Sequence, residues 1–315
     1  MTRFGSFDWP CTNVPSYPWC NLFYHQFVHH GEQSVLTSSL SSNAQTAAVG
    51  INPICGIPRL NKAAADGSDL GNIANTIIAG ISVFLVIGML TRVGRRKAAV
   101  ARVEFRVFLA AYAVSLVLQI LTLGSYFSQG STVLAALTAI HAGVVAAMFW
   151  FLLANAIVST QIVEDGTPAS VIPLAIFGTA FFVGTLYVSL DTAFNWTSAF
   201  VANPPQDMNN IALFILTSVW PGVAAIAYFV VMLYVVFVML QEIKPMLWFI
   251  ASFVVFALSQ LDVFLLSKTI CKGTDGVVDG SFVATLLETA SVGLLYAGWL
   301  SITEEDWSDD LFYGN

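Results

Sequence analysis

The sequence predicts an all-α integral membrane protein: a bundle of seven transmembrane helices with the N-terminus lumenal and the C-terminus cytosolic. Composition is the first observation, since 57% of the 315 residues are hydrophobic and 10% are charged, whereas about a quarter of a soluble domain is charged. So few charges cannot cover a water-exposed surface, so lipid must cover much of the exterior. The second observation is a set of seven apolar runs near the roughly 20 residues that cross a bilayer. They are Ile73–Leu90, Val107–Leu123, Thr132–Val158, Val171–Leu190, Ile211–Leu240, Met246–Leu266 and Ser281–Leu300.

The first run, Ile73–Leu90, is expected to act as the insertion signal. No cleavable signal peptide is recognisable before it, because Asp8 and several prolines interrupt residues 1–31. The second run is short. The fifth run is the longest and contains Pro221, so a kink or a steep tilt is expected there. No strongly polar break divides this run, which favours one pass over two.

The distribution of basic residues gives the orientation, because cytosolic loops carry an excess of Lys and Arg. The second, third and fourth loops hold none, the fifth holds Lys244, and the sixth holds Lys268 and Lys272. Six basic residues follow the first run: Arg92, Arg95, Arg96, Lys97, Arg102 and Arg106. We therefore expect a cytosolic first loop. The predicted organisation is a lumenal tail (1–72), a seven-helix domain (73–300) and an acidic cytosolic tail (301–315).

All four cysteines fall on the side predicted to be lumenal. Cys11, Cys20 and Cys55 lie in the N-terminal tail, and Cys271 lies in the sixth loop. An oxidising lumen would pair them into two disulfides. Three pairings are possible, and each ties the tail to the sixth loop by one bond.

The glycosylation sequon Asn195-Trp196-Thr197 lies in the fourth loop, which is also predicted to be lumenal. Within the tail, the aromatic-rich segment from Phe4 to His30 is expected to pack against another part of the chain. The segment from Ser34 to Gly50 is rich in Ser, Thr, Asn and Ala, a composition typical of a flexible linker. Ile51 to Pro58 predicts an anchored turn before the first span.

Ionisable residues inside the spans are candidates for function, because they are costly to insert. They are His141, Asp262 and Glu288, with Gln119, Asn155 and Gln260 as uncharged companions. Hydrogen bonds between helices, a proton or ion relay, and contact with a client protein are the three interpretations. Asp262 lies near the lumenal end of its span, where its side chain could reach water.

Small residues recur at i, i+4 spacing on the third run, at Ala135, Ala139, Gly143 and Ala147. Such a stripe lets helices approach closely. Packing within the bundle is one interpretation, and a docking face for a partner helix is the other.

Several function classes are disfavoured, and we predict a protein that is not an enzyme and has no cofactor or metal. The expected cytosolic segments total about 50 residues, too few for a nucleotide-binding domain. His141 is the only histidine in a run, so a metal site within the membrane is not expected. A basic surface for nucleic acid is also missing from the sequence.

A seven-transmembrane receptor and a small-solute transporter are the alternatives. The third run ends in Ser159-Thr160-Gln161 instead of an Asp/Glu-Arg-Tyr triplet, and the seventh lacks an Asn-Pro-x-x-Tyr segment. Both features argue against a receptor. Transporters commonly have helices broken by Gly or Pro in matching halves, and Pro221 alone is taken to interrupt a span here.

Short motifs occur in a characteristic order along the whole chain. They are Cys11, Pro18-Trp19-Cys20, Cys55, Asn75-Thr76, Glu104 with Phe108, Glu164-Asp165-Gly166-Thr167, Cys271, Asp279-Gly280 and Thr303-Glu304-Glu305-Asp306. In their order and spacing, the chain resembles the fungal chitin synthase export chaperone family over nearly its full length. Tyr17 stands where that family usually has Leu, and the Ser/Thr-rich segment makes the tail longer than expected.

The resemblance implies a multi-pass protein of the endoplasmic reticulum membrane that helps a polytopic chitin synthase fold and leave that compartment, in support of cell-wall chitin synthesis. It implies no catalysis and no cofactor. The expected partners are chitin synthase, membrane lipid and vesicle-coat proteins, and no nucleic acid. For the coat, Glu304 and Asp306 fit a loose di-acidic export pattern, and a solvated acidic terminus is the alternative interpretation.

Overall fold

In the computed structural model, seven helices are long and apolar enough to cross a membrane, as the sequence predicts. The structure describes residues 3–45, 47–57, 71–96, 100–197, 199–200 and 204–303. The first four spans are α3 (Ile73–Arg95), α4 (Arg102–Leu123), α5 (Thr132–Ser159) and α6 (Pro168–Phe194). The fifth span (Ile211–Leu240) comprises α7 (Ile211–Phe214), η3 (Ile215–Val219), α8 (Trp220–Tyr234) and η4 (Val235–Leu240). The sixth (Ile243–Gly273) comprises α9 (Ile243–Leu261), η5 (Asp262–Leu266) and α10 (Ser267–Gly273), and the seventh is α11 (Gly280–Ile302).

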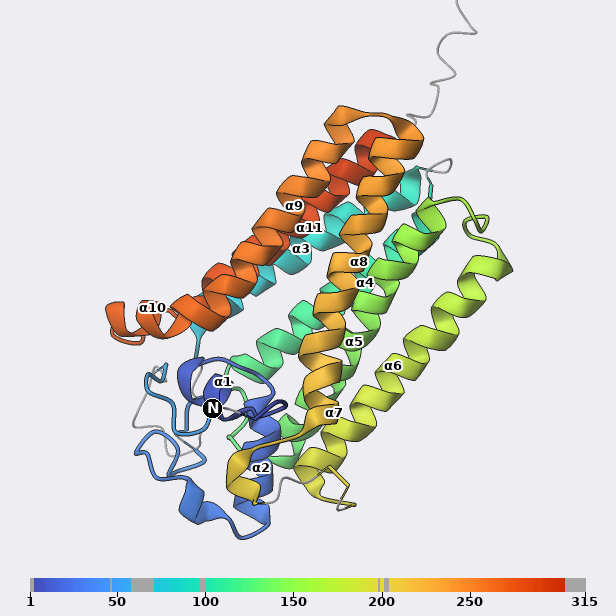
Figure 1. Ribbon diagram of the computed structural model, residues 1–315. Helices are drawn as coiled ribbons and strands as arrows, with labels where there is room; N and C mark the ends of the chain where they lie inside the picture. Colours follow the sequence, from blue (N-terminus) through green and yellow to red (C-terminus); the bar gives the residue numbers. More distant parts are fainter. Residues whose placement is uncertain are drawn as a thin grey trace, which may run out of the picture.

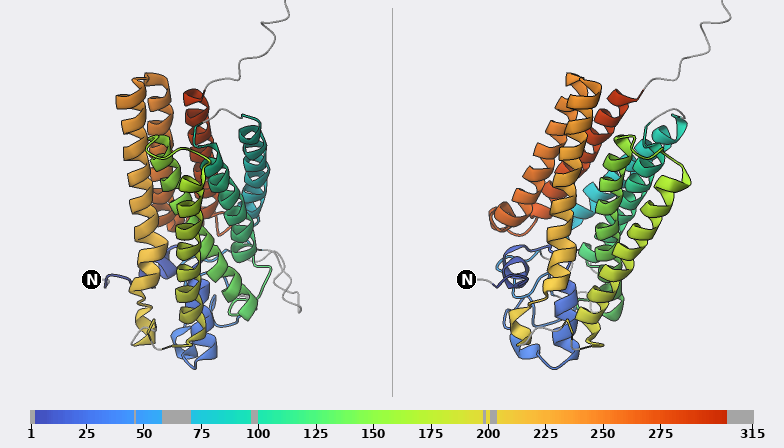
Figure 2. Two further views of the ribbon diagram at one scale, coloured as in Figure 1. Left: turned by 90° about the vertical axis from the view of Figure 1, so that its right-hand side faces the viewer. Right: turned by 45° about the vertical axis from the view of Figure 1, so that its right-hand side comes forward.

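The spans form two groups that diverge toward one end of the bundle (Figure 1). In one group α5 is central and packs against α4, α6 and α8, and in the other α11 packs against α9 and α3. α3 also packs along α4, which joins the groups. The N-terminal tail occupies the end at which the groups diverge, beside α7 and the last turns of α6 (Figure 2). We refer to this as the tail end of the bundle and to the other as the opposite end.

The fifth span departs from regular α-helix at two places. The wider π-type turns η3 and η4 lie before and after α8, and Pro221 follows η3 as the second residue of α8. A proline has no backbone N–H to donate, and its ring displaces the preceding turn of the helix. The distortion expected at Pro221 is therefore found just before it. The expectation that Pro221 alone interrupts a span was wrong, because Pro173 lies inside α6 as its sixth residue, where it removes a hydrogen bond within the helix.

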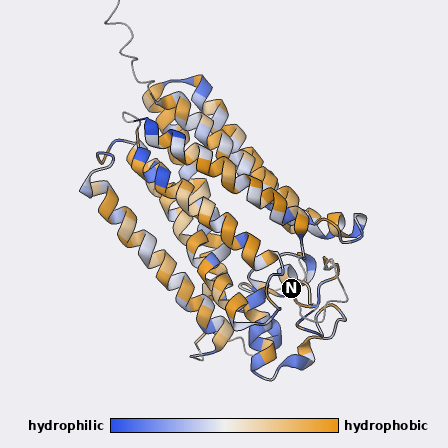
Figure 3. Ribbon diagram, turned by 180° about the vertical axis from the view of Figure 1, so that it is seen from behind, coloured by the Kyte–Doolittle hydropathy of each residue, from blue (hydrophilic) through white to orange (hydrophobic). Residues whose placement is uncertain are grey.

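Large apolar side chains cover the exterior. Hydrophilic residues gather toward the helix ends and in the tail (Figure 3). Phe84 on α3, Ile176 on α6, Val230 on α8 and Leu265 on η5 are more than half exposed. Between the helices, Phe105, Tyr228 and Trp299 are among the largest fully buried side chains. An apolar exterior around a packed interior fits lipid as the surrounding solvent.

The tail forms a packed unit with its own core. It contains α1 (Asp8–Asn13), α2 (Cys20–His29) and η1 (Gln33–Val35), and a short turn, η2 (Pro205–Asp207), lies in the fourth loop. Phe7, Phe23 and Phe27 of the tail are fully buried in a cluster that includes Ala139 of α5 and Leu213 of α7. The packing expected for the aromatic-rich segment is therefore present.

The segment from Ser34 to Gly50 does not behave as the flexible linker that its composition suggested. Ser41, Ala47 and Val49 are buried, and the Tyr24 hydroxyl donates to the Ser41 carbonyl at 2.8 Å. Asn52 also binds this segment, because its side-chain amide donates to the Val35 carbonyl at 2.7 Å. Small and polar side chains pack here against the aromatic tail helices, which composition alone does not reveal.

Candidate functional site: a cavity under a disulfide-anchored tail

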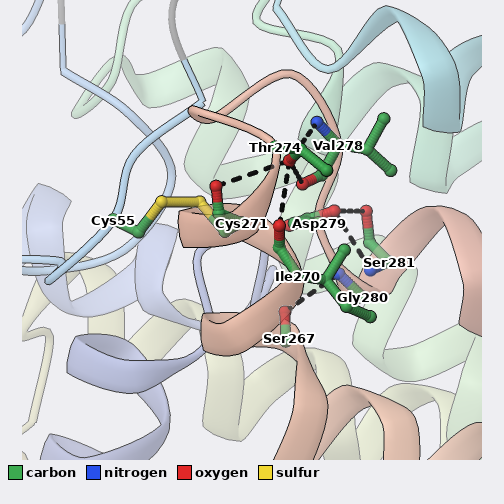
Figure 4. Close-up of a disulfide and its surroundings, with 9 residues drawn as sticks. All are labelled: Cys55, Ser267, Ile270, Cys271, Thr274, Val278, Asp279, Gly280 and Ser281. Carbon is green, nitrogen blue, oxygen red and sulfur yellow. Dashed lines mark hydrogen bonds between the residues drawn. A yellow bond between two sulfur atoms is a disulfide. The ribbon is translucent and has the colours of Figure 1, made fainter.

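Two disulfides hold the tail. Cys11 pairs with Cys20, nine residues away, with their Cα atoms 5.6 Å apart. Cys55 pairs with Cys271 of α10 across 216 residues, with a Cα–Cα distance of 6.2 Å (Figure 4). This is one of the three pairings that the sequence left open. The short bond closes the turn between α1 and α2, and the long bond fastens the end of the tail to α10, at the end of the sixth span.

The sixth loop is rigidly built around this second disulfide (Figure 4). Thr274 donates its hydroxyl to the Ile270 carbonyl at 2.9 Å, and Asp279 caps α11 by accepting from Ser281 N at 3.0 Å. Gly280 N donates to Ser267 Oγ at 3.2 Å, and a Cβ at Gly280 would lie 2.7 Å from Ser267 Cβ. Burial raises the pKa of Asp279, and hydrogen bonds from Ser16 and Ser281 oppose this shift.

Side chains of α2 dock the tail onto α4, α5 and α6. His25 Nδ1 lies 2.9 Å from the carbonyl of Ala193, and the His25 ring packs edge-to-face against Phe194. Asn21 Nδ2 donates to the Thr122 carbonyl at 3.3 Å. Burial lowers the pKa of His25, so the neutral imidazole is favoured in this contact. The docking is thus partly polar and sensitive to protonation.

A cavity of about 450 Å³ lies between the two helix groups, directly under the tail. The turn from Val14 to Trp19 covers it, while α4, α5, α8, α9, η5 and α11 supply the walls. Tyr17 belongs to this covering turn, and its hydroxyl lies 3.5 Å from Ser218 Oγ of η3. Burial raises the pKa of Tyr17 to about 12. The disulfide-anchored tail therefore acts as the roof of an interior space.

Two of the three predicted ionisable residues line this cavity, His141 and Glu288. Glu288 Oε1 accepts from Gln260 Nε2 at 3.0 Å, a hydrogen bond from α9 to α11. His141 is buried, with Nε2 3.3 Å from Ser115 Oγ and its ring centroid 5.2 Å from that of Trp19. The structure thus brings together residues that the sequence could place only on separate spans.

Asp262 is buried in the turn η5, with 4% of its surface exposed. The expectation that its side chain could reach water is therefore not met. Its Oδ2 is without a hydrogen-bond partner among the described residues. Distance from the helix end therefore did not predict its exposure. Of the uncharged companions, Gln119 bonds Thr285 Oγ1 at 2.7 Å and Asn155 bonds the Ala101 carbonyl at 3.2 Å.

The small-residue stripe on α5 lies inside the protein. Ala135 and Ala139 are buried in the core that α5 shares with the tail. A Cβ at Gly143 would come within 2.9 Å of the Phe182 carbonyl oxygen, so α6 packs closely there. Ala147 is also buried. Packing within the bundle accounts for the stripe, and its interpretation as a docking face for a partner helix was wrong.

The Glu164-Asp165-Gly166-Thr167 segment meets the start of α4 at the opposite end of the bundle. Asp165 Oδ2 accepts from Ala101 N at 3.1 Å, and Thr167 Oγ1 donates to the Glu164 carbonyl at 2.8 Å. Ala101 has a φ of +49°, a left-handed conformation that costs energy for a residue with a side chain. The Asp165 and Asn155 contacts on either side of Ala101 hold it there.

Glu104 completes this second cluster, and its burial was not among the expectations. It is fully buried in the first turn of α4, where its Oε1 accepts from Ser170 Oγ at 2.7 Å and Gly166 N at 3.4 Å. The available signal was an acidic residue just before the second apolar run, together with the polar, Gly-containing segment Glu164-Asp165-Gly166-Thr167 elsewhere in the chain. The cluster links α4 to α6 and has the character of a structural joint.

The remaining predicted residues are peripheral to the cavity. Asn195 is exposed at the end of α6, and the Thr197 hydroxyl of its sequon donates to Asp191 Oδ2 at 2.9 Å. Asp191 itself is buried, and sequence reasoning missed it. Glu304 and Asp306 lie outside the described residues. No group of three or more His, Cys, Asp or Glu side chains able to hold a metal occurs in the described part of the chain.

The fold and the site define a polytopic α-helical membrane protein whose disulfide-bonded tail closes a largely apolar space within the bundle. The profile of the family described as "Chitin synthase export chaperone" matches residues 3–311. The chain belongs to this chitin synthase export chaperone family. That family is named for a chaperone, not for an enzyme.

Curated relatives carry the same description. The chain is 27% identical over 303 residues to the protein of Phaeosphaeria nodorum, covering 96% of this chain and 83% of the relative. It is 25% identical over 308 residues to that of Kluyveromyces lactis, covering 96% and 93%. It is 33% identical over 221 residues to that of Cryptococcus neoformans, covering 69% and 59%. No solved structure matches the chain significantly.

Proposed function

We propose that this protein is a membrane chaperone that helps chitin synthase fold and leave the endoplasmic reticulum, and so supports chitin synthesis in the cell wall. The observation that carries the proposal is the family match over residues 3–311, together with relatives of that description aligned over 96% of the chain. The seven spans agree with this role, because a polytopic client would be met within the bilayer.

The proposed orientation places the tail and the sixth loop in the lumen and the first loop in the cytosol. Two disulfides and the exposed Asn195 lie at the tail end. Arg92 and Arg95 end α3, and Arg102 begins α4, at the opposite end. Disulfides persist in an oxidising compartment, and basic loops favour the cytosol, so both sets of residues support the same arrangement.

The client surface is not the stripe on α5, which the bundle buries, and the carboxylates of Glu288 and Asp262 also lie inside the bundle. Glu288 is held by Gln260, and Asp262 is 4% exposed. In this proposal these polar groups shape the interior, while the client meets the apolar exterior of the spans. Vesicle-coat proteins are proposed to read Glu304 and Asp306.

The test is deletion of the gene in a fungal strain whose chitin synthase carries a fluorescent tag. Chitin synthase is expected to stay in the endoplasmic reticulum and aggregate, with less chitin in the wall, and the wild-type gene is expected to restore export. An unrelated plasma-membrane protein, followed in the same cells, should reach the surface normally. Normal surface delivery of unaggregated chitin synthase in the deletion strain would contradict the proposal.

A further inference from the structure

The cavity under the tail is larger than the packing of a membrane bundle requires. Protein interiors are close-packed, and voids larger than a water molecule are few. This cavity measures about 450 Å³, within the range of about 300–1,000 Å³ typical of small-molecule sites. A space of this size needs an occupant, because its walls forgo contacts that a filled interior would make.

The walls combine a broad apolar surface with one acidic group. Six Phe and Trp side chains line the space: Trp19, Phe108, Phe149, Phe229, Phe256 and Phe264. Glu288 is the acidic residue among the lining residues, and no Lys or Arg of the described chain joins it. A carboxylate with no cation beside it disfavours an anionic ligand and favours a donor of hydrogen bonds.

The other polar residues of the wall are largely satisfied by the protein itself. The Tyr112 hydroxyl lies 3.0 Å from Thr289 Oγ1, and Gln119 donates to Thr285 Oγ1. His141 has hydroxyls within reach of both ring nitrogens, those of Ser115 and Thr122. Glu288 differs, because Gln260 engages only its Oε1 and the residue keeps partial exposure while lining the cavity.

We propose that the cavity binds a membrane amphiphile, with an amine or hydroxyl head group on Glu288 and an apolar chain or ring system against the aromatic walls. Glu288 lies eight residues into α11, about 12 Å from the start of that helix at 1.5 Å per residue. A head group bound there is drawn below the level at which lipid head groups lie. The roof of the site is the turn from Val14 to Trp19.

The dimensions favour a lipid-sized ligand over a helix of a client protein. One turn of an α-helix with its side chains is about 10–12 Å wide and 5.4 Å long, so it would fill the whole cavity. A client span of some 20 residues cannot enter it. The experiment below must therefore also be able to detect a client helix that contacts this cavity.

α8 and α9 diverge toward the tail end (Figure 1), and in this proposal the ligand enters from the bilayer on this side. Pro221, Gly222 and Ala225 of α8 line the cavity on this side, opposite Gln260 and Val263. A Cβ at Gly222 would meet no atom within 4 Å. A larger side chain at Gly222 can therefore occupy the cavity without a clash at its first carbon.

The experiment uses the full-length protein in its native membranes and three clickable photoreactive probes: a long-chain sphingoid amine, a sterol and a fatty acid. The amine or the sterol is expected to label the wild-type protein in competition with its unlabelled parent, and the fatty acid is not. Gly222→Phe should lower this labelling about tenfold or more by filling the site, and Glu288→Gln should lower it about tenfold by weakening the bond to the head group. The arm that labels identifies the source of the ligand.

Gly184→Phe is the matched control, because Gly184 lies exposed on α6, also with no atom within 4 Å of an added Cβ. It should leave labelling unchanged. Gly222→Leu is a smaller filling variant, and size-exclusion chromatography identifies variants that fold. Labelling that is equal for the fatty acid, or unchanged in folded Gly222→Phe and Gly222→Leu, would overturn the proposal. A photoreactive residue at position 222 that crosslinks to chitin synthase instead of lipid would do so too.

Discussion

Removal of the bond between Cys55 and Cys271 should destabilise the protein more than removal of the bond between Cys11 and Cys20. Chain entropy assigns about 5 kcal/mol to a closed loop of 216 residues and about 2.5 kcal/mol to one of nine. The bilayer reduces the larger value, because helices that stay inserted already keep both ends of the loop near one membrane face. We therefore expect Cys271→Ser to cost about 3–4 kcal/mol, which lowers the melting temperature by on the order of 10 °C.

The assay is thermal unfolding of the purified protein in detergent, followed by the fluorescence of a thiol-independent dye. Cys55→Ser, Cys271→Ser and the double variant should melt at the same temperature, because each removes the same bond. Cys11→Ser serves as the comparison for the short loop. Additive losses from Cys55→Ser and Cys271→Ser would refute the pairing, and a larger loss from Cys11→Ser would refute the argument from loop length.

Three further predictions concern single sites. Burial lowers the pKa of His25 below its ordinary 6.5, so the contribution of the neutral ring to tail docking is complete above about pH 6.5 and is lost as the pH falls toward the lowered pKa. Limited proteolysis of the tail should therefore be faster at pH 5.5 than at pH 7.5, and this difference should shrink in His25→Asn. Asp279→Asn should melt at or above the wild-type temperature, because it keeps the cap of α11 without a buried charge. Asp279→Ala should lose about 1 kcal/mol of stability, because the cap is removed. An equal loss of stability in the two variants would contradict this. Replacing both Glu304 and Asp306 with Ala should slow departure of tagged chitin synthase from the endoplasmic reticulum in a pulse-chase experiment, and unchanged export would remove the export-signal hypothesis.

The seven spans were predictable because each depends on a local property, a run of apolar residues long enough to cross a bilayer. Their ends were less so: α4 begins at Arg102, five residues before the expected Val107. Arginine at a helix end can place its charge in the interface while the backbone continues, so the apolar run underestimates the helix. Asp262, which lies in the wide turn η5 of the sixth span, is likewise buried against expectation.

The cavity could not be predicted because its residues come from separate parts of the chain. Glu288 was a candidate as a carboxylate in an apolar run, yet its contact with Gln260 depends on how α9 packs on α11. The roof from Val14 to Trp19 depends on the tail fold, for which aromatic content gave only the expectation of packing. The choice among three cysteine pairings likewise required three-dimensional distances.

The span of the second disulfide also sets a timetable for biogenesis. In the proposed orientation, Cys11 and Cys20 can be oxidised as soon as the beginning of the chain reaches the lumen, but Cys55 must wait for a partner made 216 residues later. At 5–20 residues per second, that interval lasts about 10–40 s. The bond between Cys55 and Cys271 can therefore form only after six spans have been made and Cys271 has reached the same side of the membrane as Cys55. In an unfinished or wrongly inserted chain, Cys55 keeps a free thiol.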